Sequence, residues 1–81
     1  MDKQKLLTIL QKAYPDMVFQ LQGMGCHFQI KAVGECFADL SRVKRQQLLN
    51  TVLKPFFLDG SIHAVNYTLL TPAEAQEIKG I

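Results

Sequence analysis

Residues 26–33, with the sequence Cys-His-Phe-Gln-Ile-Lys-Ala-Val, decide the fold of this chain. Apolar and polar side chains alternate along them, and this period of two predicts a strand. One face of the strand carries the side chains expected in the core, which are Cys26, Phe28, Ile30 and Ala32. The other face carries histidine, glutamine and lysine, so we expect it to stay solvated, as in an antiparallel pair with a single buried side.

The residues before this strand predict a helix and a first strand. Apolar residues at helical spacing predict a helix over residues 2–13, with Asp2 as its N-cap and Pro15 ending it. Apolar residues from Met17 to Leu21 then alternate with glutamines and predict the first strand. Gly23-Met24-Gly25 is short enough to connect the two strands as a hairpin.

The residues after it predict a helix, a third strand and a last helix. Residues 42–58 carry a wide apolar stripe at helical spacing, with Ser41 as N-cap and Pro55 predicting a kink or a break into two helices. Residues 62–70 are rich in β-branched and aromatic side chains and predict the third strand. The sequence Thr-Pro-Ala-Glu at residues 71–74 predicts a capping box and a short helix that frays at residues 79–81.

The predicted order is therefore α-β-β-α-β-α, an α+β fold in which residues 1–81 form a single domain. The first two strands should pair antiparallel, whereas a helical crossover makes the second and third parallel and right-handed. We expect a three-stranded mixed sheet with helices packed on one face.

Composition narrows the classes of function. An 81-residue chain with 48% hydrophobic and 20% charged residues is typical of one globular domain, too small for an enzyme with a large cleft. A net charge of +2 is too low to indicate nucleic-acid binding by itself. Cys26 and Cys36 lie too far apart on an extended run for a disulfide, so we expect reduced thiols in the cytoplasm, with Cys36 buried beside Phe37. We see no signal peptide and no membrane span.

Three side chains at the ends of the predicted strands are candidate metal ligands: Cys26, His27 and His63. Thiolates and imidazoles suit zinc or iron–sulfur centres, but no local spacing matches a closed four-ligand zinc site. These residues indicate a shared site that another molecule's thiolates would complete. Ordinary packing, with a small thiol in a strand and two surface histidines, explains the same pattern.

A basic cluster at the start of the second helix, made by Arg42, Lys44 and Arg45, is the candidate nucleic-acid-binding site. Free N–H groups at a helix start, with cations nearby, can hold a phosphate. The cluster is equally explained as a solvated face. No arrangement of nucleophile, base and orienting acid stands out, so we expect no enzyme.

The chain resembles the BolA family, in particular its small IbaG-type bacterial branch. The resemblance rests on Gly-Cys-His-Phe-Gln-Ile-Lys-Ala-Val-Gly-Glu at 25–35 and Phe-Ala-Asp-Leu-Ser-Arg-Val-Lys-Arg-Gln-Gln at 37–47. Ile-His-Ala-Val at 62–65 and Thr-Pro-Ala-Glu at 71–74 follow in the same order. The match is specific and extends over most of residues 23–74.

The resemblance implies a class II KH-like fold and a non-enzymatic, cytoplasmic partner of monothiol glutaredoxin in iron–sulfur trafficking or iron and stress regulation. A 2Fe–2S cluster would be shared with the glutaredoxin and glutathione, with His63 as one ligand. The second ligand comes from the hairpin loop, where family members with a loop cysteine carry it at the position of Met24. Cys26 and His27 therefore both stay open as the second ligand.

The resemblance also implies an alternative function, a DNA-binding transcriptional regulator that uses Arg42, Lys44 and Arg45. The low charge and the lack of stacking aromatics on the open strands disfavour it. A homodimer of the free protein also stays open.

Overall fold

A two-residue turn at Gly25-Cys26 joins the first two strands in the computed structural model, which describes residues 1–79. Strand β1 (Val18–Met24) pairs antiparallel with β2 (His27–Val33), so that Met24 lies opposite His27. Gly25 has a φ of +69°, as a glycine at the first position of such a turn allows. The expected hairpin connection was therefore too long, because Gly23 and Met24 belong to β1.

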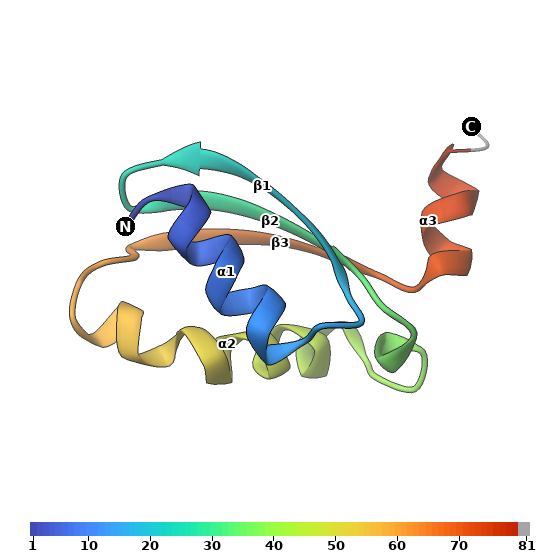
Figure 1. The fold of residues 1–81 in the computed structure, drawn as a ribbon. Helices are drawn as coiled ribbons and strands as arrows, with labels where there is room; N and C mark the ends of the chain where they lie inside the picture. Colours follow the sequence, from blue (N-terminus) through green and yellow to red (C-terminus); the bar gives the residue numbers. More distant parts are fainter. Residues whose placement is uncertain (80–81) are drawn as a thin grey trace.

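The remaining elements follow in the predicted order (Figure 1). Helix α1 (Lys3–Ala13) precedes β1, and the short 3₁₀ helix η1 (Glu35–Phe37) precedes α2 (Arg42–Leu58). Strand β3 (Ala64–Leu70) then leads into α3 (Pro72–Lys79). Strand β3 thus begins two residues later than expected. The predicted fraying at residues 79–81 lies mostly outside the described residues.

The sheet has the order β1-β2-β3, with β2 and β3 parallel, which confirms the mixed three-stranded sheet. Figure 1 shows α1 and α2 on the same side of the sheet, whereas α3 begins at the end of β3 farthest from the hairpin. The polar side chains of Gln20, Gln22 and Gln29 are exposed on the other face, as expected from the alternation. One covered and one wet face follow directly from this period of two.

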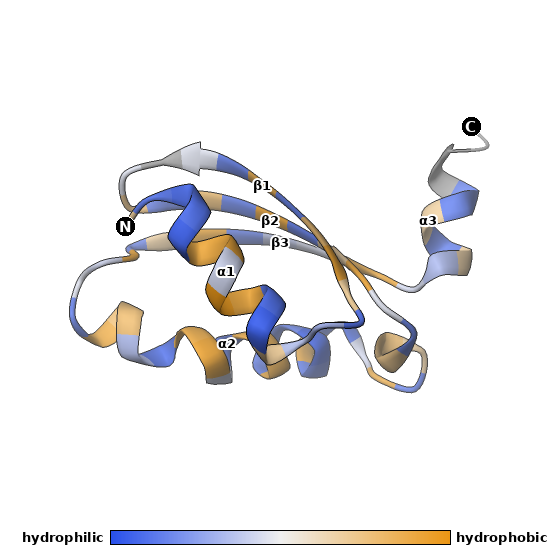
Figure 2. Cartoon of the chain, viewed as in Figure 1, coloured by the Kyte–Doolittle hydropathy of each residue, from blue (hydrophilic) through white to orange (hydrophobic). Residues whose placement is uncertain are grey.

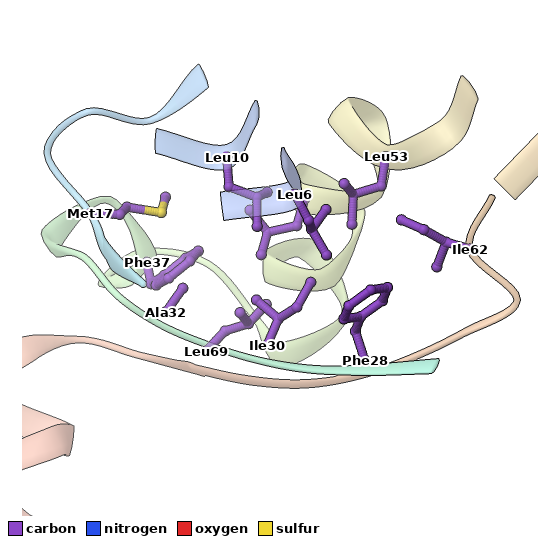
Figure 3. Packing of buried hydrophobic residues seen from close by; sticks show 11 residues of the cluster. Leu6, Leu10, Met17, Phe28, Ile30, Ala32, Phe37, Leu53, Ile62 and Leu69 are labelled. Carbon is purple, nitrogen blue, oxygen red and sulfur yellow. The ribbon is translucent and has the colours of Figure 1, made fainter. Parts of the chain in front are cut away.

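The core lies between the sheet and the first two helices (Figure 3). Leucines from both helices meet Ile30 and Phe28 of β2, and Phe37 of η1 is also buried in this core. Each such side chain contributes roughly 1.5–3 kcal/mol when fully buried. Hydrophobic positions alternate with hydrophilic ones along the strands (Figure 2).

The predicted helix caps are confirmed. Asp2 accepts a hydrogen bond from the Lys5 backbone N–H at 2.8 Å, and the Ser41 hydroxyl accepts one from Lys44 at 3.3 Å. Thr71 and Glu74 form the reciprocal capping box, in which each side chain accepts from the other residue's backbone N–H. These local signals fix where α1, α2 and α3 begin.

The break allowed at Pro55 does not occur, and the expected burial of Cys36 was wrong. Helix α2 runs without a break through Pro55, whose missing N–H would have bonded the Thr51 carbonyl. Both residues are exposed, so water can solvate that carbonyl and the helix continues. Cys36 is exposed and not buried, because η1 turns Phe37 into the core and leaves its neighbour on the surface. Both cysteines are free.

Within residues 1–79, no helix combines the length and the apolar character that a membrane span requires.

Candidate metal centre

The hairpin turn and the start of β3 are held together by their backbones. The Cys26 carbonyl accepts hydrogen bonds from the N–H groups of His63, at 2.8 Å, and Ala64, at 3.2 Å. In the parallel register, His27 lies opposite Ala64. Two segments that are 37 residues apart in sequence therefore meet at one end of the sheet.

Two imidazoles come together at this end. The rings of His27 and His63 have centroids 6.5 Å apart and are nearly perpendicular, with an interplanar angle of 86°. Both side chains are exposed, so a second molecule can reach them. Neutral imidazole donates a nitrogen lone pair to zinc, copper or iron. The pair can therefore supply two ligands to a metal centre without rearrangement of the core.

Cys26 is half-buried and does not join the two imidazoles in a common ligand set. Across the described part of the chain, no group of three histidine, cysteine or acidic side chains is placed to hold a metal ion. The structure thus brings His27 and His63 together and leaves the Cys26 thiol apart. Any metal here needs further ligands from another molecule.

The loop before β3 lies against the His63 ring. A Cβ atom placed on Gly60 would be 3.6 Å from the His63 Nε2 atom, and Gly60 has a φ of +81°. The nearby Asp59 carboxylate accepts a hydrogen bond from the Ser61 N–H at 2.8 Å. Hydrogen bonding to Ser61, first from its side chain and then from this N–H, lowers the pKa of Asp59. Asp59 therefore stabilises the turn in which it lies.

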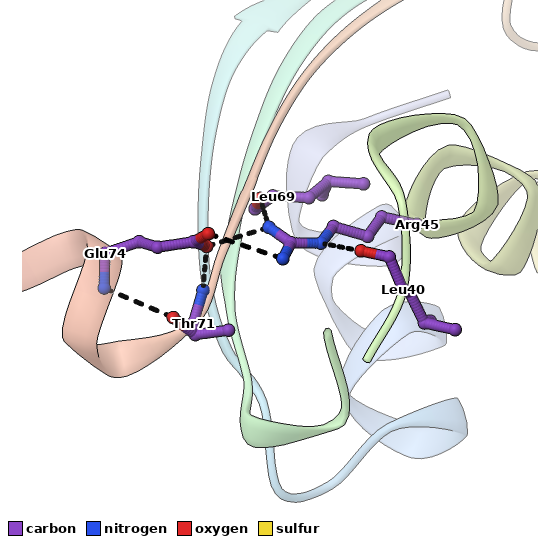
Figure 4. A network of polar contacts seen from close by, with 5 residues as sticks. All are labelled: Leu40, Arg45, Leu69, Thr71 and Glu74. Carbon is purple, nitrogen blue, oxygen red and sulfur yellow. Dashed lines mark hydrogen bonds and ion pairs between the residues drawn. The ribbon is translucent and has the colours of Figure 1, made fainter. Parts of the chain in front are cut away.

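The basic cluster of α2 is divided by the structure. Arg42 and Lys44 are exposed, but the Arg45 side chain is only 12% exposed and points inward (Figure 4). Its Nε donates to the Leu40 carbonyl and its Nη1 to the Leu69 carbonyl, both at 3.0 Å. Arg45 is thus a structural residue, and the candidate nucleic-acid site keeps two exposed cations.

Glu74, for which the sequence predicts only a place in the capping box, completes this network. Its carboxylate receives Arg45 Nη1 at 2.8 Å and Nη2 at 3.4 Å, and it also accepts from the Thr71 N–H. The hydrogen bond from Arg45 is the main reason that the pKa of Glu74 falls from 4.5 to about 2. Arg45 and Glu74 are 29 residues apart, so no local spacing indicates their contact.

Comparison with known proteins agrees with the resemblance seen in the sequence. The family model described as "BolA-like protein" matches residues 4–74. The acid stress protein IbaG of Escherichia coli is 39% identical over 74 residues, which cover 91% of this chain and 88% of IbaG.

Two solved structures from Arabidopsis thaliana have the same fold. BolA1 superposes with a TM-score of 0.74 at 26% identity, and the BolA domain of SufE1 with 0.76 at 25% identity. Each comparison covers 88% of this chain and 92% of the other.

Proposed function

Because this chain belongs to the BolA-like protein family, we propose that it is a non-enzymatic partner of monothiol glutaredoxin that helps to hold or transfer a bridging 2Fe–2S cluster. The observation that carries the proposal is the exposed pair of imidazoles, His27 and His63, beside the hairpin. The name of the relative IbaG, an acid stress protein, agrees with a role in stress regulation.

The donor set fits a cluster that is shared between two proteins. In one class of 2Fe–2S protein, two histidines replace two cysteines on one of the irons and raise the reduction potential. His27 and His63 would supply those imidazoles, and the partner and its glutathione would supply thiolates for the other iron. An incomplete, exposed ligand pair is what such sharing requires, because a closed site could not accept another protein's ligands.

The geometry favours His27 over Cys26 as the loop ligand. The His27 ring already faces that of His63, whereas the half-buried Cys26 is held by its carbonyl, which bonds the backbone of β3. The Cys26 thiol does not form a ligand group with the two imidazoles, so its side chain would first have to turn toward them. His27 and His63 would therefore bind the cluster from positions at the starts of two strands that backbone hydrogen bonds hold together.

The test is to mix the protein with cluster-loaded monothiol glutaredoxin under anaerobic conditions and record visible absorption and circular dichroism. We expect a changed spectrum with the wild-type chain, and loss of that change with His63→Ala or His27→Ala. Cys26→Ser should retain it. Gln29→Ala, an exposed substitution on the same strand, is the matched control and should behave as wild type. A His63→Ala variant that gives the wild-type spectrum would refute the proposal.

The nucleic-acid alternative gains no support from the structure. Arg45 is committed to contacts within the chain, and the residues left exposed, Arg42 and Lys44, are two cations on one helical turn. Neutralising few phosphates gives weak binding with a shallow salt dependence.

A further inference from the structure

Strand β3 has an unpaired outer edge. Within residues 1–79 it pairs with β2 alone, at one end of the order β1-β2-β3. In a parallel ladder, alternate residues direct both backbone groups to the same neighbour. Ala64 donates to the Cys26 carbonyl and the Leu70 carbonyl accepts from Gly34, so the even-numbered residues of β3 face β2. The backbone groups of Val65, Tyr67 and Leu69 therefore point outward.

Within the described chain, the outward backbone groups have a hydrogen-bond partner only near the C-terminal end of β3. The Leu69 carbonyl accepts from Arg45, whereas within the described chain no hydrogen bond reaches the outward backbone groups of Val65 and Tyr67. The strand sequence Ala-Val-Asn-Tyr-Thr-Leu-Leu contains no charge and no proline. Proteins commonly block an exposed edge with charged residues or proline, with bulges or with a covering segment. An edge without these devices is a template for another strand.

A groove of about 400 Å³ runs along this edge. It is lined by four consecutive residues of β3, Tyr67 to Leu70, together with Arg42, Arg45 and Gln46 of α2 and Glu74 of α3. Successive side chains of a strand point to opposite faces. A cavity that touches four residues in a row therefore lies along the edge of the strand and not under one face.

The charge of the groove indicates what it accepts. Glu74 is neutralised by Arg45, and among the side chains that the structure describes theirs is the single ion pair. Arg42 is thus an exposed guanidinium without an ion-pair partner in the described chain. The site combines unpaired peptide groups with one uncompensated positive charge at its rim.

We propose that the outer edge of β3 binds an extended peptide segment of a partner protein by strand addition, with an acidic residue of the peptide over Arg42. Main-chain hydrogen bonds to Val65 and Tyr67 would supply affinity, and the carboxylate would fix the position of the peptide. A nucleic-acid strand lacks the regular alternation of N–H and C=O groups that such an edge matches. The site is separate from the imidazole pair, so it does not rest on the proposed function.

The test uses the full chain and a defined probe, the blocked peptide Thr-Val-Thr-Val-Thr-Val-Glu-Glu, titrated into ¹⁵N-labelled protein. We expect chemical-shift changes along β3 and slower amide hydrogen exchange at Val65 and Tyr67. A probe with N-methyl groups on all of its amides should bind at least about tenfold more weakly, because neither of its edges can donate hydrogen bonds to the strand. A probe ending in Lys-Lys should also bind more weakly.

A pair of protein variants tests the charge. Arg42→Ala should weaken binding of the acidic probe by about fivefold, whereas Lys44→Ala, which removes the same charge two residues away, should change it less than about twofold. Both residues are exposed, so neither substitution should unfold the chain. Equal binding of the N-methylated probe, or shifts confined to another surface, would overturn the proposal. So would a single-stranded oligonucleotide that occupies the edge when the acidic peptide does not.

Discussion

Replacement of Arg45 by methionine should destabilise the chain far more than the same replacement at Arg42, three residues earlier on α2. Arg45 joins the turn before α2, the end of β3 and the capping box of α3 through one guanidinium. The Cζ atom of Arg45 also lies 5.7 Å from the centroid of the Phe37 ring. Arg42 is exposed and has no ion-pair partner in residues 1–79.

The expected cost comes mainly from the two backbone carbonyls that Arg45 satisfies. Each hydrogen bond contributes about 1 kcal/mol, so losing both lowers the free energy of unfolding by about 2 kcal/mol. The ion pair adds little, because the Glu74 side chain is 42% exposed and water can replace its partner. Methionine retains most of the aliphatic volume, which limits the contribution of lost packing. For a domain of this size, the change corresponds to a fall in Tm of roughly 8–16 °C.

The assay is thermal and urea unfolding followed by circular dichroism, on wild type, Arg45→Met, Arg45→Lys and Arg42→Met. Lysine keeps the charge but cannot reach all three acceptors, so Arg45→Lys should fall between wild type and Arg45→Met. Arg42→Met should stay within about 0.5 kcal/mol of wild type, since it removes a cation that opposes the helix dipole. If Arg45→Met and Arg42→Met unfold at the same temperature, the guanidinium does not hold these elements together.

Two further predictions concern Glu74 and the hairpin. The ionised Glu74 should stabilise the fold fully above its unfolded pKa of 4.5, and this stabilisation should be lost as the pH falls toward the folded pKa of about 2. Glu74→Gln should therefore be less stable than wild type at pH 7, with a gap that narrows between about pH 4.5 and pH 2 in urea titrations; a constant gap would contradict the assignment. Gly23→Ala should cost about 1–3 kcal/mol in urea unfolding, because a Cβ there would overlap the His27 carbonyl and its φ is +108°; Gly25→Ala, with free space around it, should cost less.

The sequence predicts the elements well because their signals are local. The Ser41 cap and the capping box at residues 71–74 depend on neighbours within a few positions, and the structure confirms both. The alternation predicted over residues 26–33 is confirmed from His27 to Val33, whereas Cys26 lies in the turn. Neither the break allowed at Pro55 nor the burial expected of Cys36 occurs, because the local pattern does not show which residues face solvent. A proline on the solvent side does not break its helix, and a cysteine beside a buried phenylalanine need not share its burial.

Contacts between distant segments are harder to predict from the sequence. The ion pair of Arg45 cannot be predicted from local spacing, since Glu74 lies 29 residues beyond Arg45 and the two meet only once β3 is in place. The imidazole pair is different, because a parallel register predicts that the starts of β2 and β3 share one end of the sheet. Sequence reasoning could therefore name both histidines, but it could not choose between His27 and Cys26.

Strand β3 connects the two proposed sites while keeping them apart. His63 precedes its first residue, and the guanidinium-lined groove adjoins its last four. The four residue steps of strand from His63 to Tyr67, the nearest residue of the groove, extend about 13 Å, which is more than one Debye length at physiological salt. Substitution of His63 should therefore leave the affinity for an acidic peptide unchanged, and substitution of Arg42 should leave the spectrum with loaded glutaredoxin unchanged. Because each site has a variant that does not touch the other, failure of one proposal would not count against the other.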